Sequence, residues 1–239
     1  MTLYIGTSGW CYQHWKNVFY PRDINSKDFL KYYAEYFATV EINNSFYKMP
    51  TQEVLKEWLN TVPKNFKFSV KASRYITHMK KLKDPSESLV NLFKAIKVLD
   101  DKLGPILFQL PPRWRCNLQR LDSFCKLLPK SYKYVFEFRD TSWFNIEVYD
   151  LLKEHNIALC IYNLNDYVSP LEVTADFIYV RLHGPGDAYK GKYNYESLRS
   201  WAEIICKWNK SGKEVSCYFN NDELGYAAQN ALELSRIIK

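Results

Sequence analysis

Eight short apolar runs recur along this chain, and segments with helical periodicity separate most of them. The apolar runs lie at residues 3–5, 40–43, 66–71, 105–110, 133–139, 157–163, 177–183 and 215–221. The periodic segments lie at residues 29–37, 54–59, 89–101, 118–127, 146–154, 195–210 and 226–237. Strands that alternate with helices form parallel sheets with right-handed crossovers. Eight such units in 239 residues fit a closed barrel better than an open sheet, and we predict an α/β fold, a single (β/α)8 TIM-like barrel with eight parallel strands.

The series runs from end to end without a linker or a low-complexity tract, so we expect a single domain spanning residues 1–239. No apolar run approaches the roughly 18–20 residues of a membrane span, and the first ten residues lack the features of a secretory signal. The six cysteines are scattered without a C-x-x-C pair, which suggests neither a zinc site nor a disulfide framework. We therefore predict a cytoplasmic protein with no membrane partner.

Polar residues gather where the predicted strands end. Arg181 and His183 lie two residues apart, so their side chains share one face of a strand that Gly184-Pro185-Gly186 then ends. In a (β/α)8 barrel, chemistry takes place at the C-terminal ends of the strands. Burial of many polar groups is costly even when they are paired, so a polar rim is hard to explain by stability alone. This rim predicts a functional site.

The rim residues divide by chemistry into two groups. The catalytic candidates are Glu41, Lys71, Glu137 and His183, and we prefer His183 as general acid or base because its ordinary pKa lies near neutrality. The substrate-binding candidates are cationic, amide and aromatic side chains. They are Asn43, His78, Gln109, Arg139, Trp143, Arg181, Tyr189, Asn220 and Asn221.

Two further chemistries are open to this rim. Glu41 and Glu137 could serve as the carboxylate pair of a glycoside hydrolase, or they could neutralise Lys71, Arg139 and Arg181, which we favour because cations outnumber acids. Carboxylates and histidines could also bind a divalent metal, but the interleaved cations oppose this. The sequence requires neither a metal nor another cofactor.

Seven segments of the chain carry a family resemblance. They are IGTSGWCYQHWKNVFYP at 5–21, VEINNSFYKMP at 40–50, FSVKASRYITH at 68–78, LGPILFQLPP at 103–112, FEFRDTSWF at 136–144, YVRLHG at 179–184 and YFNNDELGYAAQNA at 218–231. In these segments the chain resembles the DUF72 family, the YecE-like proteins, over essentially its whole length. The resemblance implies a TIM-barrel-like fold and no activity, because the family has none assigned. Asn17 departs from the family pattern, which often has glycine there.

The formal net charge of +7 makes an anionic partner plausible. Barrels often hold phosphate at the loops after strands seven and eight, beside a helix N-terminus. Here Lys190, Gly191 and Lys192 follow strand seven, Asn220-Asn221-Asp222 can cap the last helix, and Arg181 could clamp the anion. We predict an enzyme, hydrolase-like or lyase-like, that uses acid–base or hydrolytic chemistry on an anionic or phosphorylated substrate. The alternatives are a protein that processes or binds nucleic acid, and a non-catalytic interaction protein on a barrel scaffold.

Overall fold

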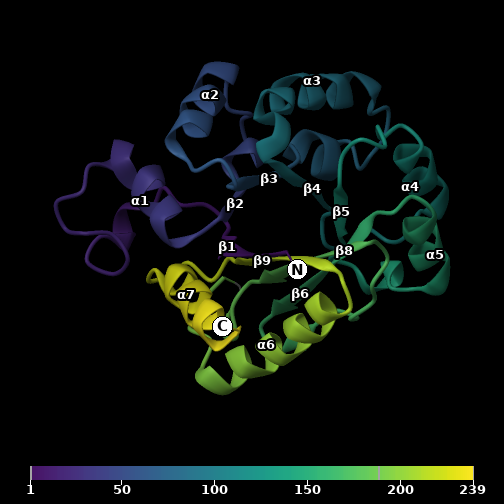
Figure 1. Ribbon diagram of the computed structural model, residues 1–239. Coiled ribbons are helices and arrows are strands. Elements are labelled where there is room, and N and C mark those ends of the chain that lie inside the picture. The colour runs from purple at the N-terminus through teal and green to yellow at the C-terminus, as the bar shows by residue number, and fades with distance from the viewer. Residues whose placement is uncertain (1, 188, 239) are drawn as a thin grey trace.

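The computed structural model describes residues 2–187 and 189–238 and contains eight parallel strands that surround a common axis (Figure 1). The strands are β1 (Leu3–Thr7), β2 (Thr39–Ile42), β3 (Lys67–Lys71), β4 (Leu103–Gln109), β5 (Tyr134–Glu137), β6 (Ala158–Leu164), β8 (Phe177–Leu182) and β9 (Glu214–Phe219). Their order in the sheet is β1-β9-β8-β6-β5-β4-β3-β2. A single parallel bridge between Ser8 and Glu41 joins the two ends of this order. The prediction of a (β/α)8 TIM-like barrel with eight parallel strands is confirmed, with a barrel that is nearly closed.

Helices cover the outside of the sheet (Figure 1). They are α1 (Phe29–Tyr36), α2 (Gln52–Thr61), α3 (Ser86–Ile96), α4 (Leu118–Cys125), α5 (Ile146–Glu154), α6 (Tyr195–Lys210) and α7 (Tyr226–Ile238). The single helix predicted at 89–101 is wrong in its C-terminal part. There, residues 97–102 form a 3₁₀ helix in which Asp100 has a φ of 43°, a conformation that an α-helix excludes. Among the residues that the structure describes, no helix is both long enough and apolar enough to cross a membrane. The cytoplasmic location stays a prediction.

The link from β6 to β8 contains no α-helix in its described residues. Each of the other connections between successive parallel strands does contain one. The chain turns back at once, and β7 (Tyr167–Val168) pairs antiparallel with the end of β6. Hydroxyl groups of the returning segment then satisfy the backbone of β6. Ser169 Oγ accepts from the Tyr162 amide at 2.9 Å, and Thr174 Oγ1 accepts from the Leu159 amide at 2.8 Å. Side chains thus supply partners for backbone groups of β6 on the link that follows it.

The two faces of the strands differ in what they bury. Outward residues such as Phe68, Phe136 and Val180 pack in the large apolar core beneath the helices. Inward residues such as Tyr179 and Tyr218 belong to a smaller cluster inside the barrel. Because side chains alternate along a strand, Tyr179, Arg181 and His183 follow one another up the inner face of β8. This alternation brings charged groups onto the barrel axis.

Candidate functional site

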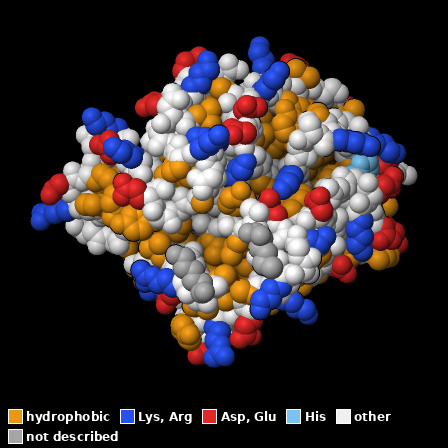
Figure 2. All heavy atoms as spheres, viewed as in Figure 1, with side chains coloured by type: hydrophobic (Ala, Val, Ile, Leu, Met, Phe, Trp, Pro, Cys, Tyr) orange, Lys and Arg blue, Asp and Glu red, His pale blue; other side chains and the backbone are white. Residues whose placement is uncertain are grey.

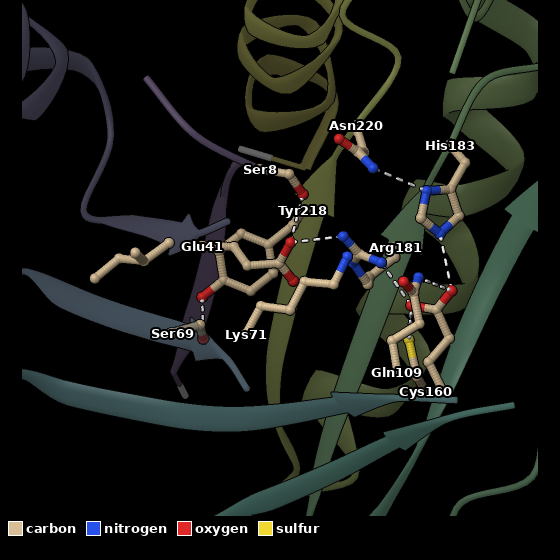
Figure 3. Close-up of polar contacts among 12 residues, drawn as sticks. Ser8, Glu41, Ser69, Lys71, Gln109, Cys160, Arg181, His183, Tyr218 and Asn220 are labelled. Carbon is tan, nitrogen blue, oxygen red and sulfur yellow. Dashed lines mark hydrogen bonds and ion pairs between the residues drawn. The ribbon is translucent and has the colours of Figure 1, made fainter. Parts of the chain in front are cut away.

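A buried arginine joins two carboxylates across the barrel axis. Arg181 on β8 donates through Nη2 to Glu41 Oε1 at 2.7 Å and through Nη1 to Glu137 Oε2 at 2.6 Å. All three side chains have no exposed surface. Figure 3 shows Arg181 and Glu41 reaching toward each other from β8 and β2, which β9 and β1 separate in the barrel. Since a lone buried charge is strongly unfavourable, each of these ions requires the others.

Two neutral donors also bind Glu41. Ser8 Oγ donates to Glu41 Oε1 at 2.7 Å, and Tyr179 OH donates to Glu41 Oε2 at 2.6 Å. Both carboxylate oxygens therefore accept hydrogen bonds from the protein itself. Because Glu41 also has no exposed surface, its carboxylate is not presented to a ligand at the barrel mouth.

Glu137 is held in the same way. Arg139 Nε contacts Glu137 Oε1, Gln109 Nε2 donates to that oxygen at 2.9 Å, and His183 Nε2 lies 3.2 Å from it. Burial alone would raise the pKa of Glu137, but Arg139, Arg181 and His183 together hold it well below its usual range. We therefore assign Glu41 and Glu137 to the neutralisation and positioning of arginines. The carboxylate pair of a glycoside hydrolase does not fit this geometry, because that chemistry needs oxygens that reach the substrate.

His183 is fully buried between Arg139 and Asn220. Its Nε2 lies 2.9 Å from Arg139 Nη2, and its Nδ1 lies 3.1 Å from Asn220 Nδ2. Burial lowers the pKa of His183 to about 3, in spite of Glu137. The imidazole is therefore neutral near pH 7 and is a weak base. This placement argues against the predicted role of general acid or base and makes His183 a positioning residue for Arg139.

We expect the stability of the protein to fall as pH drops below about 6.5 because of His183. In that range the unfolded state takes up a proton that the folded state, with a pKa of about 3, does not. The unfolded state thus binds more protons, and acid favours it. Between pH 7.5 and 5.0 the loss amounts to about 2 kcal/mol. Urea unfolding measures the free energy of unfolding at the two pH values. Its decrease between pH 7.5 and 5.0 should be smaller by about this amount in His183→Gln than in the parent protein. An equal decrease in both proteins would contradict this account.

Lys71 differs from the two arginines because no carboxylate holds it. Among the described residues its ammonium group makes no ion pair and no hydrogen bond, and Nζ lies 4.2 Å from the centre of the Phe46 ring. Burial, together with the nearby positive charge of Arg181, lowers the pKa of Lys71 to about 8. Lys71 is therefore the group of this site that changes protonation closest to neutral pH.

A cavity of about 650 Å³ opens beside these groups at the C-terminal ends of β4, β5 and β6. Four of the predicted substrate-binding residues line it: His78, Gln109, Arg139 and Tyr189. The Arg139 guanidinium lies 4.8 Å above the Tyr162 ring, and its side chain is only 10% exposed. Tyr189 stands edge-on to His183 with 5.3 Å between ring centres. The cavity thus brings the Arg139 cation together with aromatic and amide groups, and its lining also includes the carboxylate of Asp166.

Three other predicted binding residues lie elsewhere. Trp143 has no exposed surface, stacks on Phe138 at 4.8 Å and donates to the Trp114 carbonyl, so it belongs to the core. Asn221 is buried and donates to the Gly191 carbonyl and to Asn230. Asn43 is half-buried and lines a separate cavity of about 320 Å³ with Trp10 and Trp58. The stacking role of Trp143 and the ligand role of Asn221 do not fit these placements.

The predicted anion cradle after β8 is also corrected. Arg181 cannot clamp an anion there because both its terminal nitrogens hold carboxylates. The Gly191 amide faces the Glu223 carboxylate at 3.4 Å, which would repel an anion. Asp222 does not cap the last helix, since that helix begins at Tyr226 and Asp222 instead contacts Trp15 and His14. The cationic side of the site lies at Arg139 and Lys71.

Two contributors to the site were missed by the sequence reasoning. Tyr179 binds Glu41, and it precedes Arg181 and His183 by two and four residues, so strict alternation along the strand could have identified it. Phe46 lies under Lys71 and stands edge-on to His78 at 5.0 Å. No sequence signal separates Phe46 from an ordinary core aromatic. Among the described residues, no group of three His, Cys, Asp or Glu side chains is placed to hold a metal.

Comparisons with known proteins identify relatives of this chain. A family model described as "Protein of unknown function DUF72" matches residues 4–239. The UPF0759 protein YunF of Bacillus subtilis is 26% identical in an alignment that covers 99% of this chain and 94% of that protein. YecE of Escherichia coli K12 is 28% identical over 59% of this chain and 50% of its own length. The crystal structure of a DUF72 family protein from Thermotoga maritima superposes with a TM-score of 0.91 at 30% identity, covering 100% of this chain and 99% of that one. Another from Enterococcus faecalis has a TM-score of 0.86 at 22% identity, covers 99% of this chain and 95% of that one, and supports the fold alone.

Proposed function

Because this chain belongs to the DUF72 family, whose description assigns no activity, we propose its function from the geometry of its site. We infer an enzyme that binds an anionic small molecule at the C-terminal mouth of the barrel and transforms it by acid–base chemistry. The proposal rests on one observation: Lys71 is a partly buried cation for which the described residues offer no carboxylate.

The charge balance of the site supports an anionic ligand. Three cations, Lys71, Arg139 and Arg181, face two carboxylates, Glu41 and Glu137, and the carboxylates are already bonded to the two arginines. One positive charge therefore remains when Lys71 is protonated. An anion that enters the adjacent cavity would complete this balance, and Arg139 in the cavity wall adds donors. Electrostatic attraction is strong here because the groups are shielded from water.

We assign acid–base chemistry to Lys71 because of its pKa. A general acid or base works best when its pKa lies near the working pH, and burial lowers the pKa of Lys71 to about 8. His78 lines the cavity, and its pKa is lowered to about 4 by burial and then by Lys71, so it is neutral. Lys71 is thus better suited than either histidine to exchange a proton near neutrality.

Phosphate should raise the melting temperature of the protein by binding at Lys71. An anion present at ten times its Kd contributes about 1.4 kcal/mol, which corresponds to a rise of about 3–6 °C for a chain of this size. Lys71→Met removes the charge while keeping most of the apolar stem, so most of the rise should disappear. Differential scanning calorimetry with and without phosphate measures both proteins.

The matched control is Lys210→Met, which removes an exposed lysine at the end of α6. Sodium chloride at the same ionic strength corrects for general salt effects, since phosphate also stabilises proteins by exclusion from their surface. An equal phosphate response in Lys71→Met, Lys210→Met and the parent would refute the anion site.

One observation favours nucleic acid as a second candidate ligand. The adjacent loops after β2, β3 and β4 (residues 43–51, 72–85 and 110–117) contain seven cations and one acid, a net charge of +6. The cations are Lys48, Arg74, Lys80, Lys81, Lys83, Arg113 and Arg115, and the acid is Asp84. Tyr47 and Tyr75 are exposed in the same loops. By contrast, the face in Figure 2, where both termini lie, carries positive and negative side chains interspersed.

Single-stranded nucleic acid binds to surfaces that combine basic and aromatic side chains, and its affinity falls steeply with salt. Anisotropy of a labelled oligonucleotide at several salt concentrations would distinguish this candidate. A steep salt dependence that flattens in an Arg113→Ser, Arg115→Ser double variant would favour nucleic acid over a small anion.

A further inference from the structure

Lys71 is presented as an amine that the protein leaves uncommitted. Arg181 and Arg139 are fixed by carboxylates, whereas Nζ of Lys71 makes no polar contact in the described part of the chain. The residue ends β3 at the mouth of the barrel, and it is only partly buried. In Figure 3 its side chain reaches toward Arg181 from the opposite wall. A ligand at the mouth can therefore meet the amine directly.

The surroundings of this amine favour its neutral, nucleophilic form. Burial and the nearby positive charges of Arg181 and Arg139 disfavour the ammonium form and together outweigh the opposite effects of Glu41 and Glu137. The face of the Phe46 ring, 4.2 Å from Nζ, excludes water on one side, although the ring itself attracts an ammonium group. A lysine becomes a nucleophile when it is desolvated by an apolar surface or lies beside another cation, and Lys71 combines both conditions. The low pKa of about 8 agrees with this geometry.

Lys71 lies next to the wall of the 650 Å³ cavity without itself lining it. It pairs with Leu107 in the sheet, and Gln109, two residues further along β4, lines the cavity. His78 and Arg139 continue the same wall. An anionic group held at Arg139 would leave the rest of a small molecule pointing back toward Lys71.

We propose that Lys71 forms a covalent imine with an aldehyde or ketone that carries a carboxylate or phosphate group. This inference deepens the proposed function and rests on it. The neutral Nζ attacks the carbonyl carbon and forms a C–N bond. The carbonyl oxygen takes up one proton from Nζ and one from solvent and leaves as water, so the product is the protonated imine, an iminium. No oxidant or reductant is consumed. The resulting iminium withdraws electrons from the neighbouring carbon, so a proton or a carbon–carbon bond there becomes easier to release, which is lyase-type chemistry.

Reductive trapping tests the imine. The protein is incubated at pH 7 with glyoxylate or pyruvate and sodium cyanoborohydride, which turns an imine into a stable secondary amine. Peptide mass spectrometry should place the adduct at Lys71 with at least tenfold preference over any other lysine. Acetone, a neutral ketone, should give much less adduct, and added phosphate should suppress the labelling.

Two variants separate specific from general reactivity. Lys71→Arg keeps the positive charge and should lose the adduct, while Lys80→Arg, which changes an exposed lysine of the neighbouring loop, should keep it. Labelling spread evenly over surface lysines would overturn the imine proposal. If phosphate still stabilises the parent and not Lys71→Met, but no adduct forms at Lys71, the anion-binding function stands and the imine alone is refuted.

Discussion

We expect Glu137→Gln to lower the free energy of unfolding by about 3–5 kcal/mol at pH 7, because it leaves buried cations without their partner. Glu137 binds Arg181 and Arg139 and has no exposed surface. Glutamine has nearly the same volume, so the loss reflects charge and not a cavity. Typical domains are stable by about 5–15 kcal/mol, so this is a large share of the total. Urea unfolding followed by circular dichroism measures the difference.

The control for this effect is Glu214→Gln, which also breaks an ion pair. Glu214 lies 2.8 Å from Lys133, but both side chains are partly exposed. Surface pairs of this kind contribute about 0–1 kcal/mol. If Glu137→Gln costs no more than Glu214→Gln, the central network is not held together by its charges. Adding Arg181→Met to Glu137→Gln should cost less than the sum of the two single changes, because the two residues contact each other.

The order of strands and helices was predictable because each element carries its own local periodicity. The link between β6 and β8 shows the same principle, since residues 164–176 have no helical pattern and form no helix. The convergence of Gln109, Glu137, Arg181 and His183 followed from alternation and from the rule that strand ends face one mouth. Local patterns were sufficient for these features.

Depth along the barrel axis was not predictable in the same way. Arg181 lies within β8 and is fully buried, whereas Arg139 lies two residues beyond the end of β5 and reaches the cavity. Both residues looked equivalent as cations at strand ends. Which carboxylate each one binds depends on contacts such as Arg181–Glu41, between residues 140 positions apart. Trp143 could likewise stack on Phe138 or on a ligand, and only packing decides.

These pairings explain why the pKa of Lys71 is lowered, whereas the pKa of each arginine is raised. Glu41 and Glu137 have their oxygens occupied by the arginines and by neutral donors, so they stabilise Arg181 and Arg139 more than Lys71. Burial and Arg181 therefore lower the pKa of Lys71, even though Glu41 and Glu137 act in the opposite direction. The network that pairs both arginines with carboxylates thus leaves the Lys71 amine without an ion-pair partner among the described residues.

Acetic anhydride, which reacts with neutral amines, should acetylate Lys71 much faster than surface lysines at pH 7. With a pKa of about 8, about one in ten Lys71 side chains is neutral at pH 7. An ordinary lysine of pKa about 10.4 is neutral in only about one in 2,500 molecules. A less basic amine is a weaker nucleophile, so we expect the rate advantage to be smaller than this ratio but still tenfold or more. Mass spectrometry of peptides after short exposures measures the rate at each lysine.

The pH profile of acetylation separates a lowered pKa from simple accessibility. The Lys71 rate should rise with pH and level off above about pH 8, because the amine is then largely deprotonated. The rate at Lys210, an exposed lysine of α6, should keep rising toward pH 10 and serves as the internal control. Phosphate should slow the reaction at Lys71 and leave Lys210 unchanged. A Lys71 rate that climbs in parallel with Lys210 would show an ordinary amine, and both the acid–base role and the imine would lose their physical basis.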